Sequence, residues 1–274
     1  MAGRVKAVVA LLITWFNALI QRIVVFALLA GPIPNHVAFI MDGNRRFARR
    51  KNEPVAKGHD QGSQALRNVL EICMRLGVPC VSVYAFSIEN FKRPKQEVDA
   101  LMELMKKGLL ELSQHGDMLE RYSVRVAGIG RTDLLPPDVL EVLRNVEELS
   151  KHNKKALFNI CMPYTSQDEI ATAVQSTVQK CLDGEIHPDD IGEEDIEEAL
   201  LTSIPGSPPL DVLVRTSGVR RLSNFFLWQS CSDAQVHFLE TLWPTFGLWD
   251  LTPIIMDYQK KQWTLQRQQK SNLD

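Results

Sequence analysis

Residues 36–50 bring together the side-chain types that can hold a metal-bound anion. An apolar run at 37–41 has the composition of a buried strand and ends in Asp42-Gly43-Asn44, which is typical of tight turns where glycine lets the backbone approach a ligand. Four arginines follow between residues 45 and 50 at helical spacing. A carboxylate can bind a hard cation such as Mg²⁺, and a helix start with guanidinium groups can bind a diphosphate. The same pattern also fits a strand-to-helix turn with a solvated basic face, and this stretch alone does not separate the two.

The elements that must position these residues alternate between strands and helices. Apolar runs predict strands at 37–41, 81–86, 123–127, 157–161, 210–215 and 235–238. After a glycine-containing turn at 57–62, helical periodicity predicts helices at about 66–77, 94–112, 136–152, 167–182, 194–201 and 253–269. This alternation predicts one α/β domain with a central, mostly parallel, six-stranded sheet that helices cover on both faces.

Three polar clusters lie where predicted strands end, and ligands bind at the carboxyl ends of strands in such sheets. The clusters are residues 42–46, residues 87–90 with Arg93, and residues 215–218 with Arg220, Arg221 and Ser223. They supply arginines, hydroxyls and an amide but few carboxylates, which favours a site for two diphosphates over a two-carboxylate hydrolase. The chain has no Gly-x-Gly-x-x-Gly, Walker lysine or Gly-x-Ser-x-Gly motif, so nucleotide-binding and serine-hydrolase functions lack their usual marks.

The composition is that of an ordinary globular protein. The 274 residues are 45% hydrophobic and 23% charged, and a formal net charge of -2 argues against affinity for nucleic acid. The five cysteines are scattered without a C-x-x-C pair or metal-ligand spacing, which fits reduced thiols in a cytosol-facing protein.

The N-terminal segment at 7–30 is strongly apolar and long enough to span a bilayer. Arg22 near mid-span would cost a few kcal/mol in hydrocarbon, which weakens a transmembrane assignment. A signal peptide is a further alternative, but residues 28–30 form a poor cleavage site. We favour an amphipathic helix that lies in a membrane surface or covers an apolar cleft, with Trp15 and Phe16 as anchors. The polar side chains on one expected helix face are Thr14, Asn17 and Gln21.

The sequence resembles the cis-prenyltransferases, the family of undecaprenyl and dehydrodolichyl diphosphate synthases. The matching segments are HVAFIMDGNRRFARR (36–50), GHDQG (58–62), VYAFSIENFKRPKQEV (83–98), LVRTSGVRRLSNFFLWQ (213–229) and LWP (242–244). They occur in the family's order from residue 31 to about 250, and the GPIPxHxAFIMDGNRR opening is most similar to the eukaryotic dolichol branch. The resemblance implies a membrane-associated helix at 1–31, a catalytic domain at 32–252 and a helical tail at 253–274.

The resemblance also implies a reaction. Isopentenyl diphosphate is added repeatedly to an allylic starter, usually farnesyl diphosphate, and each addition creates a cis double bond. Asp42 would hold Mg²⁺ against the diphosphates. The catalytic residues implied by position are Asp42, Asn44, His59, Ser87 and Asn90. The implied substrate-binding residues are Gly43, Arg45, Arg46, Arg93, Glu97, Arg215, Arg221 and Ser223.

An apolar stripe on the predicted 94–112 helix would line a tunnel for the growing chain. Its members are Val98, Leu101, Met102, Met105, Leu109 and Leu112. Ordinary packing of a helix on a core accounts equally well for about half of them.

Four departures from the family pattern bear on activity and on partners. Val219 replaces a usual Glu, Gln235 replaces a metal-binding Glu of the bacterial enzymes, and Val55 replaces a diphosphate-binding Arg. The chain also lacks the C-terminal Arg-x-Gly segment that reaches across the bacterial dimer. The resemblance therefore implies a catalytic subunit of a heteromer, completed by a Nogo-B-receptor-like accessory subunit at the cytosolic face of the endoplasmic reticulum membrane. Val55 and Val219 leave a lower-activity paralogue open.

Two rival functions fit parts of the pattern. A non-catalytic scaffold subunit of the same fold would bind a partner or polyprenyl lipid, but the retained Asp42, Asn44 and Arg215 count against it. A membrane-attached phosphate-ester hydrolase could use Asp42 and His59, but it would need further carboxylate ligands that the strand ends do not supply.

Overall fold

A sheet of six parallel strands forms the centre of the protein. The computed structural model describes the backbone of residues 2–114 and 117–271, and the side chains of residues 15–113 and 119–270. The strands are β1 (His36–Ile40), β2 (Cys80–Tyr84), β3 (Val124–Ile129), β4 (Ala156–Cys161), β5 (Val212–Arg215) and β6 (Gln235–Phe238), in the order β3-β4-β2-β1-β5-β6. Every pairing is parallel, which confirms the predicted α/β class and strand number.

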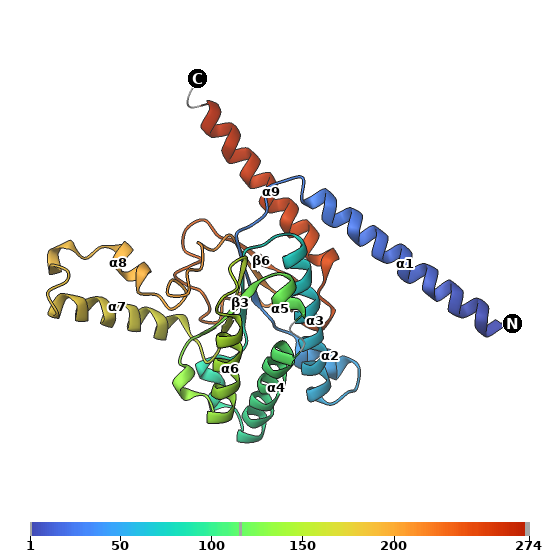
Figure 1. Cartoon of the computed structure of the whole chain (residues 1–274), viewed down its shortest axis with the longest axis horizontal. Coiled ribbons are helices and arrows are strands. Elements are labelled where there is room, and N and C mark those ends of the chain that lie inside the picture. Colours follow the sequence, from blue (N-terminus) through green and yellow to red (C-terminus); the bar gives the residue numbers. More distant parts are fainter. Residues whose placement is uncertain (1, 115–116, 272–274) are drawn as a thin grey trace.

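Helices follow the strands along the chain and cover both faces of the sheet (Figure 1). The α-helices are α1 (Ala2–Leu28), α2 (Asn44–Arg50), α3 (Val55–Arg75), α4 (Lys95–Gln114), α5 (Asp117–Arg121), α6 (Pro137–Ser150), α7 (Ser166–Leu182), α8 (Glu193–Glu198) and α9 (Leu248–Ser271). Short 3-10 helices are η1 (Ile88–Lys92), η2 (Thr132–Leu134), η3 (Pro188–Asp190) and η4 (Trp243–Thr245). The short helix α5, a single turn before β3, was not predicted from the sequence.

Side-chain alternation along each strand separates two apolar layers. Val37 and Phe39 of β1 face the larger layer, to which α3, α4, α6 and α9 contribute. Ala38 and Ile40 face a smaller layer with Tyr164 and the loop that precedes β6. A parallel strand that is buried on both faces appears in the sequence as a continuous apolar run, which explains why the strands could be predicted from the sequence.

The glycines at 58 and 62 serve helix packing, so the predicted turn at 57–62 was wrong. Both lie inside α3, where an added Cβ would come within 2.4 Å of the Asn44 carbonyl oxygen and 2.3 Å of the Asn44 Oδ1. The indole Nε1 of Trp243 donates to the Gly62 carbonyl at 2.9 Å on the same side. Without side chains here, α3 can press directly against the start of α2.

The C-terminal helix also begins earlier than predicted. α9 starts at Leu248 and contains Pro253 near its N-terminus, where a missing backbone donor is tolerated. Leu251, Ile254, Ile255 and Tyr258 are buried in the larger apolar layer, and the predicted boundary at 252/253 lies inside this helix.

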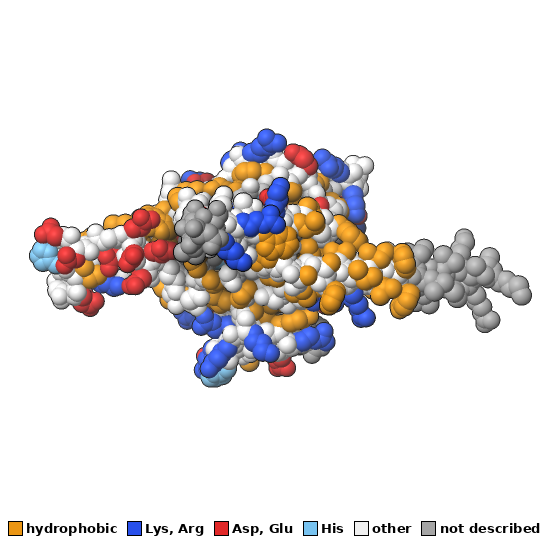
Figure 2. All heavy atoms as spheres, turned by 90° about the horizontal axis from the view of Figure 1, so that it is seen from above, with side chains coloured by type: hydrophobic (Ala, Val, Ile, Leu, Met, Phe, Trp, Pro, Cys, Tyr) orange, Lys and Arg blue, Asp and Glu red, His pale blue; other side chains and the backbone are white. Residues whose placement is uncertain are grey.

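The N-terminal helix meets α9 only at its end. The Gln259 Nε2 donates to the Leu28 carbonyl at 2.6 Å, and α1 then runs away from the body (Figure 1). Figure 2 shows apolar side chains gathered along the described part of α1, residues 15–28, while acidic side chains gather at the opposite end, over α7 and α8. Within the described part of the chain, no helix is both long and apolar enough to cross a membrane.

A buried polar network crosses the sheet beside the smaller apolar layer. The two ring nitrogens of His36 lie 2.7 Å from the Ser82 Oγ and 2.8 Å from the Pro208 carbonyl oxygen. Asn159 Nδ2 donates to Ser82 at 3.0 Å and to Ser207 at 2.8 Å. Burial lowers the pKa of His36 from 6.5 to about 4, although its hydrogen bond to Pro208 acts in the opposite direction.

This network predicts a pH dependence of stability. Below pH 6.5 the unfolded chain protonates His36, whereas the folded chain does so only near pH 4, so the stabilisation present above pH 6.5 is lost as the pH falls toward 4. The free energy of unfolding should fall by about 2 kcal/mol more between pH 7 and pH 5 in the wild type than in His36→Gln. Urea unfolding of both proteins at the two pH values measures this difference, and equal pH dependence would contradict it.

Candidate active site

The three polar clusters predicted from the sequence meet at one edge of the sheet. They follow β1, β2 and β5, which are neighbours in the order β2-β1-β5, so their carboxyl ends lie side by side. All three clusters line one cavity of about 1090 Å³. Every proposed site residue lines this cavity except Glu97.

Asp42 sits between two guanidinium groups. Its Oδ2 lies 3.0 Å from an Arg215 Nη and 3.5 Å from an Arg46 Nη. Burial raises the pKa of the Asp42 carboxyl, but hydrogen bonds from Arg215 and Ser217 and the charges of both arginines outweigh it and hold the pKa below its usual value. Asp42 is therefore an anion at neutral pH. The expected meeting of Asp42 with Arg46 and Arg215 is confirmed.

The segment after β5 organises both arginines. Arg46 donates to the Ser217 carbonyl at 2.7 Å and also to the Ser217 hydroxyl. Arg215 donates to the Ser223 Oγ at 2.6 Å and to the Arg221 carbonyl at 2.5 Å. Ser217 and Ser223 have φ values of 85° and 51°, a strained region for residues other than glycine and typical of functional loops.

Thr216 and Ser217 belong to the third predicted polar cluster, but the sequence assigned them no role of their own. The Thr216 hydroxyl donates to the Asp42 carbonyl at 2.6 Å and accepts from the Asp42 N–H at 3.1 Å, which fixes the backbone that carries the carboxylate. Their position directly after β5, beside Arg215, was the signal that placed them in this cluster. Tyr84, the last residue of β2, was missed, and its hydroxyl donates to the Ser223 carbonyl at 3.3 Å.

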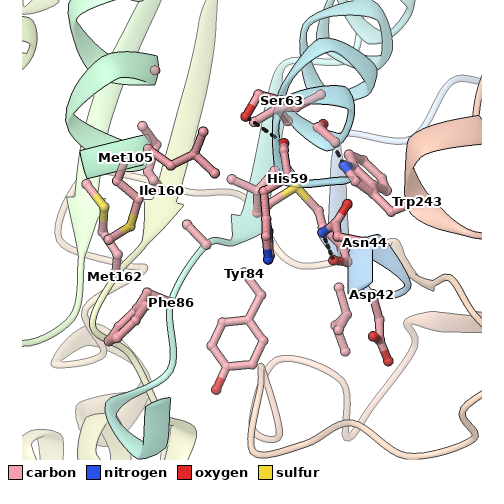
Figure 3. Close-up of a pocket in the computed structure, with 18 of the residues that line it drawn as sticks. Asp42, Asn44, His59, Ser63, Tyr84, Phe86, Met105, Ile160, Met162 and Trp243 are labelled. Carbon is pink, nitrogen blue, oxygen red and sulfur yellow. Dashed lines mark hydrogen bonds between the residues drawn. The ribbon is translucent and has the colours of Figure 1, made fainter. Parts of the chain in front are cut away.

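Asn44 and His59 lie together at the polar end of the cavity (Figure 3). Gly43, with φ of 112°, turns the chain from β1 into α2, and the Asn44 Nδ2 donates back to the Met41 carbonyl at 3.2 Å. Asn44 Oδ1 and His59 Nε2 are buried without a hydrogen-bond partner among the described residues. Burial lowers the pKa of His59, as do the charges of Arg45 and Arg93, so its imidazole is neutral. Asn44 Oδ1 packs against Gly62 of α3, so His59 Nε2 is the unpartnered polar atom that a ligand in this cavity could satisfy.

The segment after β2 borders the same end of the cavity. Asn90 Oδ1 accepts from the Ser87 N–H at 3.2 Å, which holds the turn of η1 closed. Glu97 at the start of α4 pairs with Arg93 at 2.9 Å and with Arg45 at 3.5 Å. Glu97 therefore supports the two arginines from outside the cavity.

The other end of the cavity is apolar. Figure 3 shows Met105, Ile160, Met162 and Phe86 on the side away from Asp42. Of the predicted tunnel residues, the structure places four in the cavity wall, namely Leu101, Met105, Leu109 and Leu112. The other two, Val98 and Met102, pack in the hydrophobic core and do not line the cavity, so the prediction was wrong for them.

The departures from the family pattern lie at different distances from this site. Val219 lines the cavity, whereas Val55 is exposed at the first residue of α3 and does not. Gln235 pairs with Val212 at the start of β5, three residues before Arg215, which separates it from the Asp42 edge by about 10 Å.

The donor set at Asp42 fits Mg²⁺ only in combination with substrate. The described residues contain no group of three or more His, Cys, Asp or Glu side chains that could hold a metal ion. Mg²⁺ is commonly bound by one or two carboxylates together with substrate phosphates and water. One anionic, half-exposed carboxylate facing an arginine-lined cavity meets that description.

Comparison with known proteins identifies the family. A family model described as "Putative undecaprenyl diphosphate synthase" matches residues 40–266. A dehydrodolichyl diphosphate synthase complex subunit of Schizosaccharomyces pombe is 45% identical over 245 residues, covering 89% of this chain and 92% of that protein. The human subunit of that complex is 40% identical, covering 87% of this chain and 71% of that protein.

A solved structure shows the same fold. The crystal structure of lavandulyl diphosphate synthase from Lavandula x intermedia, in complex with dimethylallyl diphosphate, matches with a TM-score of 0.78 and 33% identity, covering 83% of this chain and 95% of that chain. The chain therefore belongs to the cis-prenyltransferases, the transferases that include undecaprenyl and dehydrodolichyl diphosphate synthases.

Proposed function

We propose that this chain condenses isopentenyl diphosphate repeatedly onto an allylic starter such as farnesyl diphosphate, giving a long cis-polyprenyl diphosphate for a dolichol-type lipid. The observation that carries the proposal is a cavity with anion-binding side chains at one end and apolar walls at the other. A growing polyprenyl diphosphate has the same division between a charged head and a hydrocarbon tail.

The two diphosphates would bind on either side of Asp42. Gly43, Asn44 and Arg46 would hold the allylic diphosphate, and Arg215 with the 221–223 segment would hold isopentenyl diphosphate. Asp42 touches an arginine of each group, at 3.5 Å and 3.0 Å, so the two anions would lie within reach of one carboxylate. A Mg²⁺ ion bound by Asp42 would supply further neutralisation of the departing diphosphate.

The chain's own residues position the reactants and stabilise charge. In each cycle a carbon–carbon bond forms between the two substrates, the allylic carbon–oxygen bond breaks, diphosphate leaves with the electron pair, and the isopentenyl unit loses a proton. Arg46 would stabilise the charge that develops on the departing allylic diphosphate, while Arg215 would hold the diphosphate of isopentenyl diphosphate in place. The neutral His59 and the amide of Asn90 border this region without adding charge, and the fixed loops would bring the reacting carbons together.

Asp42→Ala tests the carboxylate at the centre of the site. Incorporation of radiolabelled isopentenyl diphosphate with farnesyl diphosphate and Mg²⁺ should fall by at least about 100-fold, because removal of a preorganised charged group costs that much in comparable sites. Asp60→Ala is the matched control, since Asp60 is exposed and does not line the cavity. Thermal unfolding of Asp60→Ala should resemble that of the wild type, whereas Asp42→Ala leaves the buried Arg215 guanidinium without its counter-ion and should unfold at a lower temperature. Incorporation is therefore measured below the unfolding transition of both variants. Retained turnover in a folded Asp42→Ala protein would remove Asp42 from this role, whereas no incorporation by the wild type would favour the non-catalytic scaffold.

A second proposal concerns the partner. It is supported by the relatives from Schizosaccharomyces pombe and human, which are named as complex subunits. We expect the purified chain to be weakly active or inactive alone and to gain activity with a Nogo-B-receptor-like accessory subunit. Full incorporation by the lone chain would refute this expectation.

A third proposal concerns where the protein acts, and the exposed side chains of α1 support it. The exposed apolar side chains of this helix include Trp15, Phe16, Ile23 and Phe26, which fit a helix that lies in a membrane surface, here proposed as the cytosolic face of the endoplasmic reticulum.

In vesicle flotation, replacing Trp15, Phe16 and Phe26 together with Ser should reduce the fraction of protein bound to vesicles. Ser replacement of Trp249 and Met256, which are exposed on α9, serves as the control, and an equal loss in both proteins would contradict a specific role of α1.

A further inference from the structure

The apolar part of the cavity follows two helices away from the diphosphate end. His59 on α3 and Glu97 on α4 mark that end, and both helices run from it in the same direction. Arg67 comes eight residues after His59, and Glu111 comes fourteen residues after Glu97, which correspond to about 12 Å and 21 Å along the helices. Arg67 and Glu111 both line the cavity, together with Leu112, so they stand well along the path of a growing chain.

Arg67 and Glu111 form an ion pair across the two helices. An Arg67 Nη lies 2.6 Å from the Glu111 Oε2, with the side chains 44% and 25% exposed. Among the described side chains, no other hydrogen bond or ion pair joins α3 to α4. A partly exposed pair of this kind contributes little to folding stability and opens readily, so it can act as a closure that a ligand displaces.

The position one helical turn before Glu111 is a glycine with open space around it. Gly108 lines the cavity, and a Cβ added there would meet no heavy atom within 4 Å. Glycine inside a helix is destabilising compared with alanine, so packing gives no reason for it here. The missing side chain widens the cavity next to the ion pair.

The size of the cavity sets a limit on the tail it can hold. A volume of about 1090 Å³ is close to the upper end of pockets for drug-sized ligands, about 300–1,000 Å³. A longer hydrocarbon must leave the cavity while its diphosphate stays at the polar end. We propose that the Arg67–Glu111 pair closes the α3–α4 wall where the tail leaves, and that this pair and the space at Gly108 together determine product length. This inference rests on the proposed polyprenyl synthesis.

Removing one charge of the pair tests the closure. Glu111→Gln keeps the size of the side chain but loses the ion pair, so the tail should leave more easily and the product distribution should shift to longer chains by one or more isoprene units. The charge exchange Arg67→Glu with Glu111→Arg should restore the wild-type distribution. Asp138→Asn is the matched control, because it breaks the Lys106–Asp138 ion pair of α4, also 2.6 Å long, which faces α6 and lies outside the cavity wall.

Filling the open space should have the opposite effect. Gly108→Leu replaces a helix-destabilising residue by a good helix former and places four carbons in the cavity, so products should become shorter. Gly108→Ala should change product length less, since its methyl group meets open space. Substitution with Leu at Lys107, which is exposed and does not line the cavity, controls for the change in helix propensity.

Products are dephosphorylated and separated by reversed-phase chromatography after incorporation of labelled isopentenyl diphosphate by the chain with its accessory subunit. If the wild-type protein makes no polyprenyl product, the proposed function fails. If it makes product but Glu111→Gln and Gly108→Leu give the wild-type lengths, only the closure is refuted. A shift of the same size in Asp138→Asn would also overturn it, because α4 stability would then explain the effect.

Discussion

The carboxylate of Asp42 is the charge on which the site depends. The Arg215 side chain is only 5% exposed, and a buried guanidinium without a counter-ion is strongly destabilising. Asp42 supplies that counter-ion and also contacts Arg46, so it keeps two arginines from different elements in one place. A diphosphate that binds Arg215 would compete with Asp42 for it. The carboxylate would then be free to bind a cation, which links substrate binding to metal binding through one side chain.

That arrangement requires α2 to start at one particular position. Asn44 must reach the cavity while its backbone and side chain pack against α3, and glycines at 58 and 62 leave the space for this contact. The indole of Trp243 donates a hydrogen bond to the Gly62 carbonyl and so holds α3 in place. The polar end of the cavity is therefore built by close approach of backbones, and a methyl group at either glycine would push α2, and Arg46 with it, away from Asp42.

Strand positions and the polar clusters at strand ends could be read from the sequence, because parallel strands buried on both faces leave continuous apolar runs and their carboxyl ends converge. The helical glycines could not, since Gly58 and Gly62 look like turn residues until the partner helix is known. The roles of Thr216 and Ser217 could not be predicted, because these residues hold the backbone of Asp42 and the guanidinium of Arg46 through contacts between segments more than 170 positions apart. The assignment of Val98 and Met102 to a tunnel failed for a related reason: one apolar stripe on α4 serves both the core and the cavity, and periodicity alone does not divide it.

The topology also explains how a charged head and a long tail can be handled by one cavity. The helices that follow β1 and β2 begin at the carboxyl edge and run back along the sheet, so the first turns of α3 and α4 lie beside the arginines and their later turns lie over apolar strands. Polarity therefore changes along the same two helices. A tail that grows by addition at the charged end must advance along them toward Gly108 and the Arg67–Glu111 pair, because the sheet closes one side and the arginine loops close the other.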